Sequence, residues 1–449
     1  MTSTPVFAVA FAGSFISVSV LARLVFCSPA GPRHPKTGLP LDPRGGTYVK
    51  NAIARGMAFV AQIKERAKGS TPHATLEAFH KPEDHAFFNE SYYFNGCDAA
   101  TRDRVVTRIS RRSNLGARSY VFLLIDSKEH GVLSLEADIP AERASNPTAL
   151  GLTYECLEPM RRWRIRYTGP MFRGSVHPKD DNSTAARAHV ALDLEYVADT
   201  DEFWYMRDDH PACLAGNLAQ EPWGMDFLRV CLKRTVDHAH YEDFGRMRGS
   251  ITVDGSTRRG YDFGTFRDHS WDIRRWATMD NLFILLIALE EPLVLAGGHE
   301  YWYLDLTLVD MPGNVGGVAR YSTGYALGKR GTPRLALTAG TSIRDIAAAP
   351  VRNARGERLP AAEHDVWMEL DAHPRDKTGA LEACAVRVVM KGDVRRAIYW
   401  PDEGAFVVYE DCLEFVCTDA RSGRTVQGYG TRQSGFRVGA FDPSLGGCG

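Results

Sequence analysis

A chain of 449 residues is longer than one typical compact domain, so we expect at least two folded units. Its formal net charge of −1 provides no overall attraction to nucleic acids, which argues against a DNA- or RNA-binding protein. The 9 cysteines are odd in number, scattered and without a CxxC pair. This usage argues against a disulfide framework or a cysteine-based zinc site and favours reduced thiols.

The N-terminal segment is apolar and uncharged over residues 5–22. A helix of this length would span about 27 Å, close to the hydrocarbon thickness of a bilayer. Basic residues follow it, so the positive-inside rule predicts a single-pass membrane anchor at 1–27 with the body of the protein in the cytoplasm. A signal peptide cleaved near residues 28–30 is the alternative.

Residues 28–46 are rich in proline and glycine and predict a stiff, extended linker. The segment 47–89 is predicted to hold an amphipathic helix and the lead-in to the first sheet. Its apolar stripe comprises Val49, Ile53, Met57, Val60 and Ile63, and its basic face comprises Lys50, Arg55, Lys64, Arg66 and Lys68. We expect the apolar stripe to pack on the following domain; a helix lying on a membrane surface is the alternative.

From residue 90 onward, apolar and polar residues alternate with period two, which predicts short strands joined by turns. The expected fold class is mainly β, with two antiparallel β-barrel or sandwich domains. We place the first β-domain at 90–245 and the second at 246–449. A helix over about 221–245 is predicted to end the first domain.

Several familiar catalytic patterns are absent from the sequence. It contains no GxSxG, no HExxH, no complete P-loop and no strand–GxGxxG–helix fingerprint, so no cofactor is predicted. His238 and His240 are two residues apart and would point in different directions on the predicted helix. We therefore predict no metal site.

The segment 264–276, GTFRDHSWDIRRW, combines acidic, basic, imidazole and indole side chains. In an extended strand its alternate residues would share a face: Arg267, His269 and Trp271 on one, and Asp268, Ser270 and Asp272 on the other. Asp268 could act as a general acid if burial raised its pKa. Alternatively, Asp268 pairs with an arginine or caps a turn, while Trp271 and Trp276 fill the core.

This segment and the VDG turn before it resemble the signature of the AttH-like and carotenoid-hydratase (hydroxyneurosporene synthase) superfamily. Residues 268–271 match the DHxW of that signature, whereas Ser270 and Asp272 stand where it has asparagine and glycine. Further landmarks occur in the order found in an uncharacterised family of animal and bacterial proteins. In some of these the module precedes a phosphoenolpyruvate-synthase-like phosphotransferase. The resemblance covers about residues 85–435.

The resemblance implies two lipocalin-like β-domains with a largely apolar site, in a superfamily that includes hydratases and cyclases of isoprenoid olefins. If the roles known in the superfamily are carried over, Asp268 would be the proton donor. Arg267 and His269, the second catalytic residue, would set its environment. Residues that would bind the substrate or stabilise a carbocation are Arg267, Trp271, Trp276, Tyr301 and Tyr303.

We therefore expect a membrane-associated protein that binds an apolar small molecule or lipid. It would hydrate, isomerise or cyclise an olefin without a cofactor, and would not bind nucleic acid. The alternatives are a non-catalytic lipid carrier or sensor and an accessory module related to phosphotransferase proteins.

Overall fold

The protein folds into two antiparallel β-sheets with few helices, as predicted from the alternating pattern. The computed structural model describes residues 48–67, 71–80, 88–112, 118–141, 146–174, 184–221, 223–224, 239–273, 276, 279–310, 320–338, 342–344, 358–360, 365–374, 383–399 and 406–438. The predicted anchor and linker lie outside these residues. No helix among the described residues is long and apolar enough to span a bilayer.

The first sheet contains the strands of the N-terminal half: β1 (Phe88–Asp98), β2 (Arg104–Arg112), β3 (Arg118–Ser127), β4 (Gly131–Pro140), β5 (Thr148–Ala149), β6 (Leu152–Glu158), β7 (Arg162–Arg173), β8 (Arg187–Ala198), β9 (Phe203–Trp204), β10 (Ala239–Val253) and β11 (Ser256–Ile273). Its order is β4-β3-β2-β1-β11-β10-β8-β7-β6-β5, with β9 beside β10. Because β4 also pairs with β7, the strands that run from β4 to β7 in this order form a closed barrel. We call it the first barrel.

The second sheet contains β12 (Asn281–Val294), β13 (Glu300–Asp310), β14 (Arg320–Leu327), β15 (Leu335–Leu337), β16 (Ser342–Arg344), β17 (Asp365–Ala372), β18 (Cys384–Tyr399), β19 (Phe406–Asp419) and β20 (Thr425–Arg437). Its order is β15-β14-β13-β12-β20-β19-β18-β17-β16. Because β15 also pairs with β17, this sheet closes as well, forming the second barrel. A short 3-10 helix, η2 (Ala296–Gly298), lies between β12 and β13.

Alternation decides which side chains fill the first barrel. Trp163, Ile165 and Tyr167 of β7 point into its core and are at most 2% exposed. The arginines between them face outward and form ion pairs: Arg162 with Glu195, Arg164 with Asp193 and Arg166 with Glu155. The arginine-rich strand is therefore a salt-bridged outer face.

The predicted domain boundary at 245/246 is wrong, because β10 and β11 both belong to the first sheet. They form a hairpin, and β1 pairs along its whole length with β11, from Phe88 opposite Ile273 to Asp98 opposite Phe263. The chain passes to the second sheet only between β11 and β12. The RDHSW motif thus lies in the first barrel, where long-range pairing with β1 holds it.

The helix predicted over about 221–245 is also wrong where the structure describes it, since residues 239–245 form part of β10. Tyr241 and Asp243 face the interior of the first barrel, whereas His240 and Glu242 bind residues on its outer side. Residues 225–238 lie outside the described part of the chain. The described helices lie elsewhere and include α3 (His73–Leu76) and α4 (Pro211–Gln220).

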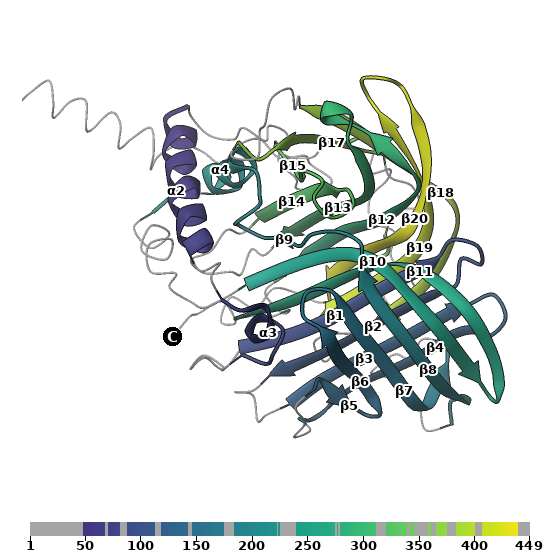
Figure 1. Ribbon diagram of the computed structural model, residues 1–449. Coiled ribbons are helices and arrows are strands. Elements are labelled where there is room, and N and C mark those ends of the chain that lie inside the picture. The colour runs from purple at the N-terminus through teal and green to yellow at the C-terminus, as the bar shows by residue number, and fades with distance from the viewer. Residues whose placement is uncertain are drawn as a thin grey trace, which may run out of the picture.

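The predicted amphipathic helix is present as α2 (Tyr48–Ala67) and lies beside α4 at one side of the barrels (Figure 1). Its packing face, however, is not the predicted apolar stripe. Ala54 and Ala58 are buried, and small alanines let the two helices approach closely. Ile53, Val60 and Ile63 of the stripe are 38%, 53% and 44% exposed.

Polar contacts explain why α2 packs through this face. Lys50 donates to the carbonyl of Glu221, and Gln62 donates to the carbonyl of Asp209 at 2.7 Å. Arg66 donates to the carbonyl of Arg207 at 3.1 Å. These anchors hold the helix against the segment around α4, so hydrogen-bond partners decided an orientation that hydrophobic periodicity did not predict.

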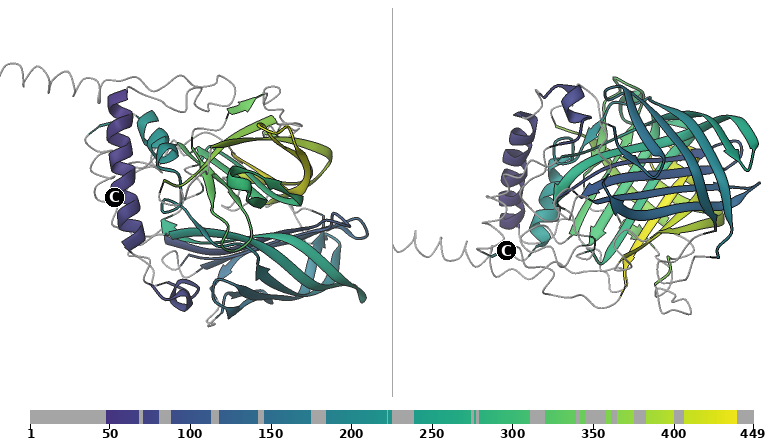
Figure 2. Two further views of the ribbon diagram at one scale, coloured as in Figure 1. Left: turned by 45° about the horizontal axis from the view of Figure 1, so that its top comes forward. Right: turned by 90° about the horizontal axis from the view of Figure 1, so that it is seen from below.

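The two barrels lie against each other (Figures 1 and 2). Aromatic side chains contribute to the contact between them. Phe244 of β10 stacks on Tyr303 of β13 with ring centroids 4.8 Å apart, and Phe203 of β9 stacks on Tyr325 of β14 at 4.2 Å. The face of β10 and β11 that would be outward in a lone barrel is therefore covered by the second barrel. Polar residues on that face are buried at the interface.

A close approach of β20 to β12 gives a first stability prediction. A Cβ atom on Gly430, within the GYG sequence, would lie 1.9 Å from the carbonyl oxygen of Leu286. Gly430→Ala is expected to lower the free energy of unfolding by about 3 kcal/mol, because strand backbone must move. Gly56→Ala in α2 meets no atom within 4 Å and is expected to raise it by about 0.5–1 kcal/mol. Urea denaturation measures both; equal effects would contradict the packing argument.

Candidate functional site

The RDHSW motif is divided between two environments because it lies on an extended strand. Arg267, His269 and Trp271 point into the first barrel and are at most 3% exposed, as the alternation predicted. Asp268 points to the opposite side, toward the second barrel, where it pairs with His240. The prediction that Arg267 and His269 set the environment of Asp268 is therefore wrong.

Inside the first barrel, Arg267 holds two carboxylates. Its Nη1 donates to Glu77 at 2.8 Å and its Nη2 donates to Asp243 at 2.6 Å. Glu77 comes from the segment after α3 and Asp243 from β10, so the guanidinium joins three elements. Burial opposes the charge of Arg267, but the two carboxylates outweigh it and hold its pKa well above the ordinary value. Arg267 is a structural anchor and does not face the cavity described below.

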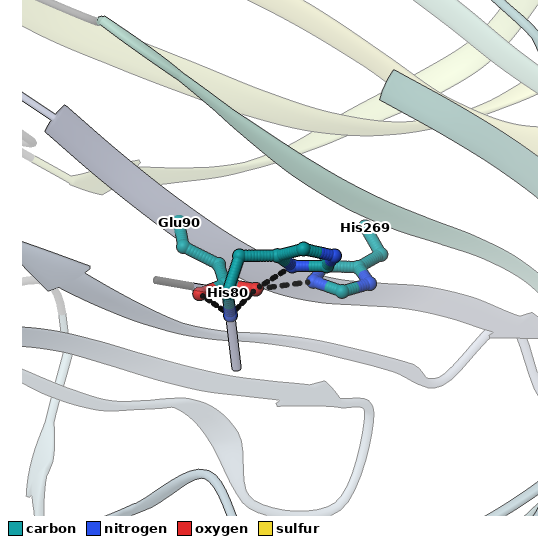
Figure 3. Close-up of side chains that lie close together, drawn as sticks. All are labelled: His80, Glu90 and His269. Carbon is teal, nitrogen blue, oxygen red and sulfur yellow. Dashed lines mark hydrogen bonds and ion pairs between the residues drawn. The ribbon is translucent and has the colours of Figure 1, made fainter. Parts of the chain in front are cut away.

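His269 continues this buried network (Figure 3). Its Nδ1 lies 2.7 Å from the hydroxyl of Tyr241 and its Nε2 lies 3.1 Å from Oε1 of Glu90. The same carboxylate oxygen lies 2.8 Å from Nδ1 of His80. Although burial opposes ionisation, hydrogen bonds from the two histidines lower the pKa of Glu90. His269 and Asp268 are neighbours in sequence that belong to separate groups.

A second polar group lies between the barrels and is separate from the first. We call it the interface cluster; its members are Tyr205, His240, Glu242, Asp268, Asp305 and Tyr325. Nε2 of His240 lies 2.9 Å from Glu242 and 3.1 Å from Asp268. Tyr205 donates to Glu242 at 2.8 Å, and Tyr325 of the second barrel donates to its other oxygen at 2.5 Å.

The interface cluster holds more acid groups than cations, and this decides the protonation of its members. Burial opposes the charge of His240, but Asp268 and Glu242 raise its pKa to about 9, so it is an imidazolium at neutral pH. Asp305 is 1% exposed, and burial together with the charges of Glu242, Asp209 and Asp268 raises its pKa well above the ordinary value. The pKa of the neighbouring Asp209 is raised by burial as well. The protonated form of Asp305 is thus favoured beside an ion pair.

A small cavity with a mixed polar and apolar lining lies near the interface cluster. Phe244 follows Glu242 on the same face of β10, and Leu286 of β12 is paired with Asp305 of β13. The cavity is lined by these two residues together with Asn95, Cys97, Gly264, Phe266, Ala288, Tyr429, Gly430 and Thr431. Its lining residues come from both barrels, so a molecule held there would contact both.

The remaining predicted binding residues do not converge on one site. Trp276 lies at the interface, with its ring 5.6 Å from that of Phe406. Tyr303 also lies there and donates to Asp199 at 2.9 Å. Tyr301 fills the core of the second barrel and donates to the carbonyl of Pro333, although it is only two residues from Tyr303. The predicted set is therefore distributed over three separate interiors.

Sequence reasoning missed most of the interface cluster. Asp305 stands between leucines in the strand pattern YWYLDLTLVD and was not among the predicted site residues. The available signal was an acidic residue that shares a strand face with a tyrosine and has a leucine on either side in the sequence. Glu242 and His240 were not identified as partners of Asp268, because a helix was predicted for their segment.

The charge of His240 makes the stability of the protein depend on pH. Because its folded pKa is raised from 6.5 to about 9, its contribution is complete below pH 6.5 and is lost as pH rises through 9. Asp268→Asn removes part of this stabilisation and is expected to cost about 1–2 kcal/mol at pH 6. The difference from wild type should shrink between pH 6.5 and 9 in denaturation experiments. A difference that does not change with pH would contradict the ion pair.

Part of the chain matches a known family model. Residues 74–296 match the family model described as Domain of unknown function (DUF7064). The matched region contains the complete first barrel and β12, and hence every interface-cluster residue except Asp305 and Tyr325. No curated protein matches the sequence.

Solved structures with a similar fold include a protein of Nitrosomonas europaea assigned as AttH, with 12% identity and a TM-score of 0.49 over 82% of this chain and 100% of that one. Kievitone hydratase from Nectria haematococca is similar with 11% identity and a TM-score of 0.46, over 78% and 88% of the two chains. CghA with Sch210972 is similar with 8% identity and a TM-score of 0.42, over 79% and 89%.

Proposed function

We propose that this protein is an acid–base enzyme that hydrates or isomerises a small apolar olefin held between its two barrels. The observation that carries the proposal is the buried acid Asp305, whose pKa is raised and which lies at the interface near an imidazolium–carboxylate pair and a small cavity lined by both barrels. General acids that work near neutral pH need such a raised pKa. This proposal transfers the acid role from Asp268 to Asp305.

The cluster is assigned two proton transfers, one from the protein to the substrate and one from the substrate or water back to the protein. Asp305 gives its proton to one olefin carbon; a C–H bond forms, the π bond breaks, and a carbocation and a carboxylate result. The aromatic face of Phe244 or Phe266 stabilises the cation. In a hydration, water adds to the cation and loses one proton to a carboxylate of the cluster. In an isomerisation, the same carboxylate takes a proton from the neighbouring carbon.

His240 is assigned a positioning role. Since its pKa lies near 9, it is protonated at neutral pH and does not serve as the base there. It holds Asp268 and Glu242 in place and balances part of their charge. Glu242, which also accepts from Tyr205 and Tyr325, is the carboxylate that returns the proton to Asp305.

The experiment compares small molecules that copurify with full-length wild type and with Asp305→Asn, identified by mass spectrometry. The expected result is an olefin on the variant and its hydrated or isomeric product on wild type. Growth or incubation in H2¹⁸O labels the product if water is added. Glu300→Gln, an exposed carboxylate on the same strand, is the control and should resemble wild type.

The same experiment distinguishes a non-catalytic carrier. If both proteins hold the same compound, and wild type does not convert it when it is added back, the protein binds the ligand without transforming it. That outcome would overturn the catalytic proposal and support the carrier predicted as the alternative.

A further inference from the structure

We infer that His80, Glu90 and His269 form a binding site for one divalent transition-metal ion inside the first barrel (Figure 3). The three residues come from the segment after α3, from β1 and from β11. The site is separate from the interface cluster, since His269 and Asp268 point to opposite sides of β11. The inference does not depend on the proposed function.

The distances are those of a nearly assembled ligand set. Nδ1 of His80 and Nε2 of His269 lie 2.8 Å and 3.1 Å from Oε1 of Glu90, and all three ligand atoms lie within 4.8 Å of one another. Ligands about 2.1 Å from a tetrahedral ion are about 3.4 Å apart. The two nitrogen–oxygen distances are thus close to this spacing, and the two nitrogens, at most 4.8 Å apart, would have to approach it.

The hydrogen bonds of Tyr241 orient His269 for metal binding. The tyrosine oxygen lies 3.1 Å from the carbonyl of Leu76, 3.1 Å from Oε2 of Glu77 and 2.7 Å from Nδ1 of His269. A carbonyl and a carboxylate only accept, and the hydroxyl has one proton to give them. In the metal-bound form, Nδ1 of His269 would donate to Tyr241, and Nε2, the ring nitrogen that faces Glu90, would be the ligand atom. An outer acceptor of this kind typically orients a metal-binding histidine.

Charge balance supports the same conclusion. The hydrogen-bonded network contains three carboxylates, those of Glu77, Glu90 and Asp243, and one guanidinium, that of Arg267. The carboxylates outnumber the guanidinium in a buried place, where an excess of negative charge is unfavourable. One divalent cation between the three ligands would offset this excess.

The surrounding rings hold the ligands in place. His80 stacks on Trp271 with ring centroids 3.5 Å apart, and His269 stacks on Tyr92 at 3.9 Å. Two imidazole nitrogens and one carboxylate oxygen suit zinc and similar ions, and three protein ligands leave a fourth position for water. The bound ion would tie the segment after α3 to the barrel wall.

The test uses full-length protein stripped with a chelator and then titrated with Zn²⁺ or Co²⁺. We expect one ion per chain, visible Co²⁺ absorption typical of tetrahedral nitrogen and oxygen ligands, and a higher midpoint of thermal unfolding with Zn²⁺. His80→Gln and Glu90→Gln should each weaken binding at least about 100-fold, and Tyr241→Phe about 10-fold. His130→Gln, in the turn between β3 and β4, is the matched control and should bind as wild type does.

The inference is overturned if wild type binds neither ion stoichiometrically, or if it binds with an affinity that His80→Gln and Glu90→Gln do not change. His80 is the most exposed of the three ligands, at 13%, so its variant is the least disturbing to the fold. If a variant does not fold, the wild-type stoichiometry and the Tyr241→Phe affinity still decide. Asp305→Asn should bind metal normally, which separates this result from that for the proposed function.

Discussion

Asp305→Asn is expected to slow product formation by about 10²–10⁴-fold and, at the same time, to raise the free energy of unfolding at pH 7. The first effect follows from loss of the proton donor. The second follows because burial and the nearby carboxylates disfavour the charged form of Asp305 in the folded state. Activity and stability would thus change in opposite directions at one residue, which is typical of a strained active-site acid.

The sign of the stability effect can be checked by varying pH. The folded pKa of Asp305 is raised, so the folded protein retains a proton that the unfolded chain loses near pH 4. Stability of wild type therefore falls as pH rises above that value, whereas the asparagine variant lacks this loss. Denaturation at pH 4, 5.5 and 7 should show a growing advantage of the variant. Glu300→Gln should show none, and a variant with unchanged turnover would exclude Asp305 as the acid.

Arg267→Met is expected to lower the free energy of unfolding by about 3–5 kcal/mol. Methionine replaces much of the side-chain volume but leaves Glu77 and Asp243 without the guanidinium that binds both. All three groups are at most 4% exposed, so water cannot replace the lost partner. Chemical denaturation at pH 7 measures the loss.

Arg164→Met is the control for Arg267→Met. Arg164 also holds a carboxylate, that of Asp193, through two hydrogen bonds at 2.8 Å and 2.6 Å. Both side chains are more than 40% exposed, and such surface pairs contribute about 0–1 kcal/mol. Similar losses in the two variants would show that burial is not what makes Arg267 important.

Period-two alternation was enough to predict a mainly β protein and to assign side chains to faces. Arg267, His269 and Trp271 lie on one face of their strand and Asp268 on the other, as expected, because neighbouring side chains on any extended strand point to opposite sides. The helix α2 was predicted for a similar local reason. Local geometry depends only on residues near in sequence, which a single chain displays.

The interface cluster could not be predicted in this way. Alternation identifies two faces of a strand but does not tell what covers each, and Asp305 and Glu242 became buried only because one barrel packs on the other. The same limit misplaced the domain boundary, since β11 finds its partner β1 more than a hundred residues away. It also hid the grouping of His80 and Glu90 with His269.

The sequence by itself determined the strands, their faces and the family resemblance of the RDHSW motif. Only the tertiary structure decided that Asp268 belongs with His240, that His269 belongs with Glu90, and that burial raises the pKa of Asp305. The physical reason is that a pKa and a ligand set depend on burial and on charges brought together by long-range pairing. Neither quantity is encoded in the spacing of residues along one strand.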